Sequence, residues 1–408
     1  MRKKKRHTLL KVVILAVIVG GVAQYSGVLP DTGVLPEEII KQIPIEQKNA
    51  KPETYSGVEE KKTEKGTEAD KEKQTAEMDI PRGYAYGTLT EEEQKVYDEV
   101  YCIIMTHDSK VKVTTCDEKV LERAYRSVMA DHGGIFWVSG YTYTQYTMGK
   151  KIVSIDFSPS YTMERAERES YQSQIDPVVD SILQNVDPSW GDYEKAKYVF
   201  EYLAGNIQYE MGTEQNQNII SVFLNKKTVC QGYANATQYL LNILNIPCTV
   251  VTGTAEGDAH AWNLVQMDGA YYYMDTTWGN SSYNNDSSGF GSFINYNYFG
   301  VTSEEIGKTH QADGTVPLPD CTATEDNYYV REGKYISAWE PDTVGQIYGT
   351  AYVNGAVTEA VRFSDASLYE QAKEYFIGEQ HIRDYCEGIT GLSYIEDKDQ
   401  NVLILKFS

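Results

Sequence analysis

The stretch from residue 258 to residue 278 constrains the fold more than any other part of the chain. Two apolar and aromatic runs, AHAWNLVQM and AYYYM, are separated by Asp268-Gly269. This dipeptide between two such runs is the strongest short-range signal for a β-hairpin. A two-residue loop pairs Met267 with Ala270, which fixes the register of the whole predicted hairpin.

The predicted register brings a histidine and an aspartate together. If pairing continues away from the loop, Trp262 lies opposite Asp275 and His260 lies opposite Thr277. Directly opposed side chains share one face of the sheet, so His260 and Asp275 become diagonal neighbours. The spacing therefore predicts a hydrogen bond between the imidazole and the carboxylate.

A helix is predicted to begin at Cys230. Small and apolar residues recur after it at three-and-four spacing, until Asn245 and Pro247 end the pattern. Thr228 and Gln231 indicate a capping box, with Thr228 as the N-cap, which places the sulfur of Cys230 in the first turn. Unpaired amides and the positive end of the helix dipole favour a thiolate at this position.

A thiol at a helix start and a histidine oriented by a carboxylate match the nucleophile, base and orienter of cysteine enzymes. Three segments carry this pattern: CQGYA at 230–234, HAWN at 260–263 and DTTW at 275–278. In order and spacing they resemble the three motifs of the transglutaminase-like superfamily core, over about residues 190–280. The resemblance implies an α+β, papain-like fold, with the cysteine helix packed on an antiparallel sheet.

The resemblance also implies a catalytic triad of Cys230, His260 and Asp275. Its chemistry is attack of the thiolate on an amide or peptide carbonyl to give a thioester, which water or an amine then resolves. Water would make the protein a peptidase or amidase, an amine would make it a protein cross-linking acyltransferase, and the sequence leaves both open. The alternative from another class is a catalytically silent binding or scaffold protein of the cell surface.

Three aromatic residues are candidates for the wall of this site. In the resembled family, the residue that helps to hold the oxyanion often precedes the cysteine, and Tyr209 stands in that position; packing of a helix end is the alternative role. Trp262 and Trp278 are predicted to flank the site, either shielding an acyl-enzyme from water or only packing. The amide of Cys230 is a candidate oxyanion donor.

No cofactor and no metal are predicted. The six cysteines and six histidines show no spacing typical of a zinc site. Cys102 with Cys116, or Cys321 with Cys386, could pair outside the cell, but sequence does not give connectivity. Cys248 lies in an apolar run and is predicted to be a buried thiol.

Residues 1–30 are predicted to be an export signal or a membrane anchor. The basic segment RKKKR precedes an apolar run, which is the layout of a signal, and cleavage and retention are both open. Residues 31–82 are rich in Glu, Lys, Thr and Pro and are predicted to be a disordered charged stalk. The protein is therefore expected to be extracellular or at the cell surface, with membrane contact through the N-terminal segment.

Charge excludes some partners. Of the 37 basic and 59 acidic residues, 14 and 13 lie in the first 79, which leaves 23 and 46 beyond them. So acidic a body is expected to repel nucleic acid and anionic membrane surfaces and to attract basic peptides or cationic wall polymers. The alternative is that the acidity only keeps a secreted protein soluble. The predicted partner is a protein or peptide substrate, including one associated with the cell wall; the oligomeric state is open.

The folded part is predicted to have three regions. Residues 83–160 form an N-terminal α/β domain, similar to one that often precedes the core in exported transglutaminase-like proteins. Its expected helices are 90–104 and 118–130, and its strands 111–116, 135–138 and 151–157. The transglutaminase-like core spans 161–320. A small C-terminal α/β unit spans 321–408, with a strand at 352–363, a helix at 366–376 and a strand at 402–407.

Overall fold

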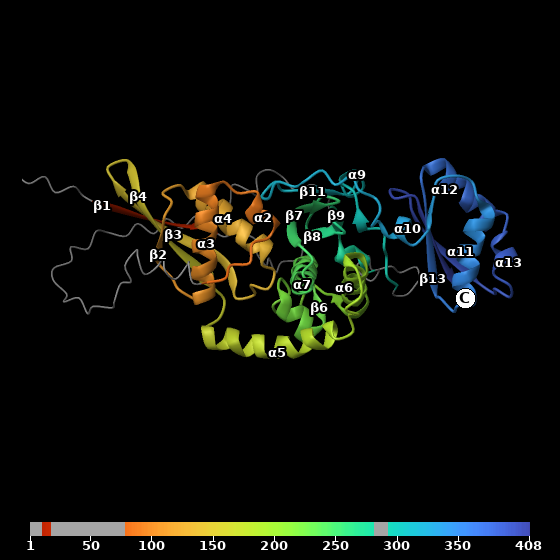
Figure 1. Ribbon diagram of the computed structural model, residues 1–408, viewed down its shortest axis with the longest axis horizontal. Coiled ribbons are helices and arrows are strands. Elements are labelled where there is room, and N and C mark those ends of the chain that lie inside the picture. Colours follow the sequence, from red (N-terminus) through yellow and green to blue (C-terminus); the bar gives the residue numbers. More distant parts are fainter. Residues whose placement is uncertain (1–9, 18–77, 281–292) are drawn as a thin grey trace, which may run out of the picture. The chain divides into compact units, whose positions relative to one another are not determined.

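A computed structural model describes residues 10–17, 78–280 and 293–408 as a mixed α/β protein (Figure 1). Residues from Ile80 onward belong to one compact unit, which also includes the N-terminal strand. Nearly all of the predicted stalk lies outside the described residues, as does most of the Gly, Ser and Asn stretch after the aspartate strand. The predicted domain boundaries stay a prediction.

The N-terminal region is built on a sheet of order β1-β3-β4-β2. The two predicted helices are confirmed, but the strand predicted at 135–138 is wrong. The strand β3 instead runs through the tyrosine-rich stretch, because Tyr141, Tyr143 and Gln145 alternate inward with the period of a strand. The elements are β1 (Leu10–Val17), α2 (Tyr84–Gly87), α3 (Glu91–Thr106), β2 (Val111–Val113), α4 (Glu118–Asp131), β3 (Val138–Met148) and β4 (Lys151–Tyr161).

Strand β1 lies within the predicted export segment. It pairs antiparallel with β3, with Leu10 opposite Met148 and Val17 opposite Tyr141. Within residues 10–17, 78–280 and 293–408, no helix has the length and apolar character needed to cross a membrane. The predictions of export and of a cleaved or retained N-terminal segment stay predictions.

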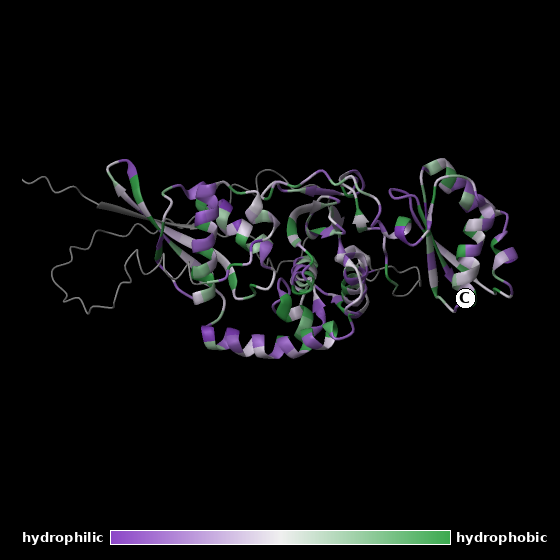
Figure 2. Cartoon of the chain, viewed as in Figure 1, coloured by the Kyte–Doolittle hydropathy of each residue, from purple (hydrophilic) through white to green (hydrophobic). Residues whose placement is uncertain are grey.

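The middle of the chain forms an antiparallel sheet of order β10-β9-β8-β7-β11. Helix α7 packs on β7 and β8, and α6 packs on α7, which is the predicted arrangement of a cysteine helix on a sheet. Helix α5 is largely hydrophilic (Figure 2) and buries only Ile175, Val179 and Ile182. The elements are α5 (Arg165–Leu183), α6 (Asp192–Asn206), β5 (Gln208–Tyr209), η2 (Ser221–Asn225), β6 (Lys227–Thr228), α7 (Cys230–Ile243), β7 (Cys248–Ala255), β8 (Asp258–Met267), β9 (Ala270–Met274), α8 (Thr276–Gly279), β10 (Phe299–Val301), α9 (Ser303–Ile306) and β11 (His310–Ala312).

The C-terminal region has its own sheet, of order β12-β13-β15-β14, with helices α11 and α12 packed on β13. The strand predicted at 352–363 begins only at Thr358, because its first residues belong to α11 and Gly355, at φ 77°, turns the chain after that helix. The elements are α10 (Tyr328–Arg331), β12 (Tyr335–Ile336), α11 (Pro341–Val353), β13 (Thr358–Phe363), α12 (Ala366–Lys373), η4 (Glu374–Gly378), α13 (Ile382–Tyr385), β14 (Leu392–Asp397) and β15 (Val402–Phe407).

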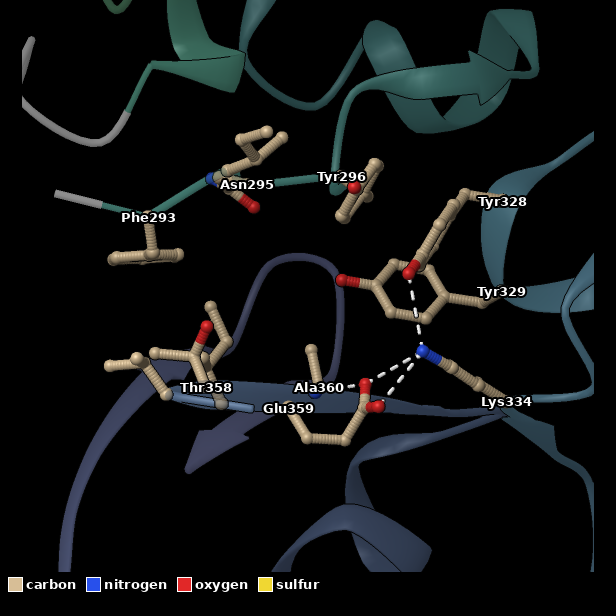
Figure 3. Close-up of a pocket in the computed structure, with 12 residues that line it drawn as sticks. Phe293, Asn295, Tyr296, Tyr328, Tyr329, Lys334, Thr358, Glu359 and Ala360 are labelled. Carbon is tan, nitrogen blue, oxygen red and sulfur yellow. Dashed lines mark hydrogen bonds and ion pairs between the residues drawn. The ribbon is translucent and has the colours of Figure 1, made fainter. Parts of the chain in front are cut away.

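A cavity of about 310 Å³ lies between the end of the core and the C-terminal sheet (Figure 3). The rings of Tyr296 and Tyr328 stack with centroids 3.7 Å apart. Lys334 Nζ donates to both carboxylate oxygens of Glu359, at 2.8 and 3.0 Å, and to the hydroxyl of Tyr328 at 3.2 Å. None of the predicted site residues lines this cavity, so it is separate from the predicted site.

A buried carboxylate, Asp131, ties the N-terminal helices to the core sheet. It accepts hydrogen bonds from the backbone N–H groups of Ala85 and Tyr86, both at 2.9 Å, and from the hydroxyls of Tyr97 at 3.2 Å and Thr249 at 3.0 Å. Burial raises the pKa of Asp131, and these hydrogen bonds oppose the rise. Because Thr249 belongs to β7, one carboxylate links α2, α3 and the core.

We expect Asp131→Asn to destabilise the protein by about 2–4 kcal/mol, since an amide nitrogen would face a backbone or hydroxyl donor in a buried site. The measurement is the free energy of unfolding from urea denaturation. Asp399→Asn, which changes an exposed side chain, is the matched control and should stay within about 0.5 kcal/mol of wild type. Equal stability of the two variants would contradict the role given to Asp131.

Candidate active site

The predicted hairpin is confirmed in its register. Strands β8 and β9 pair from Met267 opposite Ala270 to Asn263 opposite Met274. Asp268 and Gly269 have φ angles of 45° and 88°, and positive φ at both loop residues is what a type I′ turn requires. The sequence therefore gives the correct spacing between the histidine and the aspartate.

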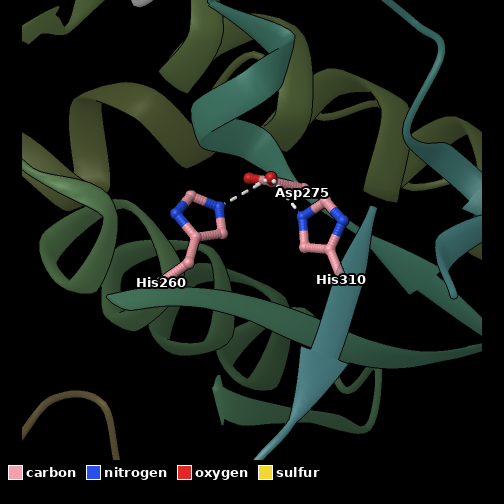
Figure 4. A group of neighbouring side chains, drawn as sticks. All are labelled: His260, Asp275 and His310. Carbon is pink, nitrogen blue, oxygen red and sulfur yellow. Dashed lines mark hydrogen bonds and ion pairs between the residues drawn. The ribbon is translucent and has the colours of Figure 1, made fainter. Parts of the chain in front are cut away.

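The strand nevertheless ends before the aspartate. Asp275 is the N-cap of the short helix α8, where its Oδ1 accepts from the backbone N–H groups of Thr277 at 2.9 Å and Trp278 at 3.2 Å. The expected pairing of His260 with Thr277 is therefore wrong. The predicted contact still forms: His260 Nε2 lies 2.8 Å from Asp275 Oδ2 (Figure 4).

Helix α7 begins at Cys230, so the cysteine is in the first turn as predicted. The predicted capping box is wrong, because Val229 is the N-cap and no side chain caps this end. Thr228 is buried in β6 instead. Its hydroxyl donates to the carbonyl oxygen of Asn216 and accepts from Ser221 Oγ, both at 2.8 Å.

The three predicted triad residues come together around the imidazole of His260. Burial alone would lower the pKa of His260, but the charge and hydrogen bond of Asp275, with a further contribution from the side chain of Cys230, raise it to about 10. Asp275 is fully buried, yet its imidazole partners lower its pKa. Because Nε2 faces Asp275, the ring nitrogen left for the thiol is Nδ1.

The predicted wall residues lie close to this group. Trp262 is buried and stacks on His260, with ring centroids 6.2 Å apart and planes at 19°. The ring of Trp278 lies 5.9 Å from that of His260. Tyr209 pairs with Thr228 in the short parallel sheet of β5 and β6, two residues before Cys230. All three aromatic residues therefore lie near either the histidine or the start of the cysteine helix.

Sequence reasoning missed a second histidine at the site. His310 Nε2 lies 3.1 Å from Asp275 Oδ2, the same oxygen that contacts His260 (Figure 4). His310 begins β11, a three-residue edge strand, and lies 35 residues from Asp275 in sequence. No turn rule or motif spacing relates positions so far apart, so nothing in the single sequence marks this residue.

His260, Asp275 and His310 also meet the distance condition for a metal site. One ligand atom from each residue lies within 4.8 Å of the others. Both imidazole nitrogens, however, are at hydrogen-bond distance from one carboxylate oxygen. A nitrogen that donates a proton has no lone pair for a metal, so the arrangement is that of a hydrogen-bond network.

The six cysteines are all free thiols, so neither candidate disulfide forms in the structure. Cys248 is fully enclosed, as predicted, and burial raises the pKa of its thiol well above the usual value. Cys116 is the exposed one, whereas Cys230 is partly exposed.

Comparisons with known proteins point to the same region. Residues 180–276 match the sequence profile of the transglutaminase-like superfamily. The kyphoscoliosis peptidase of Homo sapiens is 24% identical over 151 residues, which cover 33% of this chain and 22% of the relative. That of Mus musculus is 23% identical with the same coverage. The chain thus spans about a fifth of the length of these curated relatives.

Solved structures give partial likenesses. The crystal structure of a TGase aligns at 16% identity and a TM-score of 0.25, over 34% of this chain and 44% of that one. A putative cysteine protease from Cytophaga hutchinsonii aligns at 15% identity and a TM-score of 0.23, over 33% and 56%.

The ring of His260 is expected to titrate at about 10, measured by NMR of histidine-labelled protein. A raised folded-state pKa stabilises the fold fully below the ordinary value of 6.5, and the stabilisation disappears as pH rises through about 10. Asp275→Asn removes the charge that offsets the effect of burial on the pKa of His260, so the midpoint of the His260 titration should fall by several pH units. Asp258→Asn, at an exposed position on the same strand, should leave it unchanged; equal shifts in both variants would contradict the assignment.

Proposed function

Residues 180–276 form a transglutaminase-like core, and from this premise we propose that the protein is a cysteine enzyme that acts on amide or peptide bonds. One observation carries the proposal: a buried His260–Asp275 pair lies beside a cysteine that opens a helix. A thiolate at a helix start is stabilised by the dipole and by a neighbouring imidazolium. This pairing places an imidazole and its carboxylate partner next to the proposed nucleophile.

In the proposed reaction, Cys230 Sγ attacks the carbonyl carbon of the substrate. The C–N bond then breaks as His260 Nδ1 gives its proton to the leaving nitrogen, which leaves a thioester on Cys230 and a free amine. Asp275 accepts from Nε2 throughout, so it fixes the tautomer and stabilises the charged ring. The 2.8 Å contact between Nε2 and Oδ2 supports this role.

The oxyanion needs donors near the sulfur. The backbone N–H of Cys230 is in the first turn of α7, where no helical carbonyl is available to it. Tyr209 pairs with Thr228, two residues before Cys230. We propose that it is the second group that stabilises the oxyanion. Trp262 and Trp278, which flank His260, are proposed to limit the access of water to the thioester.

The acceptor of the acyl group decides the activity. Water gives a peptidase or amidase, and an amine gives a protein cross-linking acyltransferase. In both cases His260 takes the proton of the attacking group, and the thioester bond breaks to restore Cys230. We propose a protein or peptide substrate, and on the strength of the basic and apolar N-terminus we place the enzyme outside the cell or at its surface.

The test is incubation of the protein with a casein or peptide library, with and without a labelled primary amine. Amine incorporation would identify an acyltransferase, and new termini would identify a peptidase. We expect Cys230→Ala to lower either activity by about 10³-fold or more, and Asp275→Asn by about 10²- to 10⁴-fold.

Cys116→Ala, which removes the exposed cysteine, is the matched control and should keep full activity. Wild-type protein that yields neither product, with Cys230 no more reactive than an ordinary thiol, would contradict the enzyme proposal. It would favour instead a silent binding or scaffold protein of the cell surface.

A further inference from the structure

The carboxylate of Asp275 has more donors than a histidine-orienting aspartate needs. Oδ1 accepts from two backbone N–H groups of α8, those of Thr277 and Trp278. These two bonds already hold the carboxylate in place. Oδ2 then faces two imidazoles at once, at 2.8 Å from His260 Nε2 and 3.1 Å from His310 Nε2. The second imidazole therefore has a role besides holding the carboxylate.

The sheet pairs β11 closely with β7 and so brings the two imidazoles onto one face. Strand β7 runs between β8 and β11, with Gly253 opposite both His260 and Ala312. Opposed residues share a face, so His260 and His310 lie on one face across a strand position that has no side chain. A Cβ atom at Gly253 would lie 2.1 Å from the carbonyl oxygen of Gln311. The imidazole centroids are 5.4 Å apart.

The hydrogen-bond partners of His310 define which ring nitrogen donates to Asp275. Thr309 Oγ1 lies 2.8 Å from Nδ1, and a hydroxyl that donates there leaves the single ring proton on Nε2, toward Asp275. The groups facing His260 are Cys230 from α7, Asp275 after β9 and His310 from β11. The ring nitrogen of His310 that faces Asp275 is therefore the one that carries a proton, and it acts as a donor to Oδ2.

His310 is also held firmly. Its side chain is wholly buried, so water cannot replace it as a donor to Asp275. Three aromatic rings enclose it, with centroids at 4.7 Å for Trp278, 5.0 Å for Trp262 and 5.4 Å for Tyr298. A donor fixed in this way offsets part of the negative charge of Oδ2 at every stage of a reaction.

We propose that His310 is a positioning residue that shares the negative charge of Asp275 with His260, so that His260 can release its proton to a leaving amine. The inference rests on the proposed function. A general acid works best when its pKa lies near the operating pH, and Asp275 already raises the pKa of His260 to about 10. Without the second donor, Asp275 would bind the imidazolium proton more tightly, and His260 would be a poorer acid.

The first experiment is NMR of the histidine ring nitrogens and their protons in the full chain at pH 7. In wild type, Nε2 of His310 should carry a proton. In His310→Phe, the NMR signal of the Nε2 proton of His260 should move downfield. The pH midpoint of the His260 titration should rise by about one unit, because Asp275 loses one hydrogen bond. His310→Gln keeps a donor at a similar position and should restore both values.

A purely structural role predicts the opposite sign. If His310 only supports the fold, His310→Phe would loosen the contact between His260 and Asp275. The NMR signal of the Nε2 proton of His260 would then move upfield, and the midpoint of its titration would fall toward 6.5. His132→Phe, which removes a histidine that contacts Tyr97 in the N-terminal region, is the control and should leave His260 unchanged. If Nε2 of His310 carries no proton until the protein is treated with a chelator, a metal is bound there. That result would overturn the proposal.

A rate measurement separates this inference from the proposed function. The enzyme proposal fails if Cys230 in wild type is alkylated at the rate of an ordinary thiol and His260→Ala does not change that rate, whatever the NMR of His310 shows. If the reactivity depends on His260 but His310→Phe leaves the ring proton of His260 in place, only the inference on His310 fails. With a substrate in hand, His310→Phe should lower kcat severalfold with KM unchanged, and His310→Gln should recover it.

Discussion

The site depends on one buried carboxylate. Asp275 has no exposed side-chain surface, and an ionised carboxylate in such a place is tolerated only when its oxygens are satisfied. Two amides of α8 and two imidazoles donate to these oxygens. The donors come from three separate features of the fold: a helix start, a hairpin strand and an edge strand. The carboxylate is where the three features meet.

This dependence explains the conformation of the chain around Asp275. Had β9 continued, the backbone N–H groups of Thr277 and Trp278 would have been available to a neighbouring strand. By turning into α8 directly after Met274, the chain presents both amides to Oδ1 instead. The same turn brings Trp278 against both imidazoles. The hydrogen bonds to Asp275 and the aromatic wall of the site thus have one structural origin.

The structure departs from the sequence-based expectation at two places, for different reasons. Thr228 and Gln231 have the spacing of a capping box, but the hydroxyl of Thr228 finds its partners in Asn216 and Ser221, because β6 is buried next to the loop that precedes it. There a tertiary contact overrode a local preference. The tyrosine-rich segment after Val138 is the opposite case: its tyrosines and threonines favour a strand and alternate inward, and it forms the longest part of β3 against β1 and β4.

The sequence by itself determined the hairpin register, the cysteine at the start of α7 and the proximity of His260 to Asp275. It could do so because turn chemistry and helix periodicity act over a few residues. Only the tertiary structure decided that His310 joins them, since β11 reaches the site by pairing with the far edge of β7 at a position where Gly253 leaves room. Contacts between segments far apart in the chain depend on the packing of the whole sheet, which no short spacing encodes.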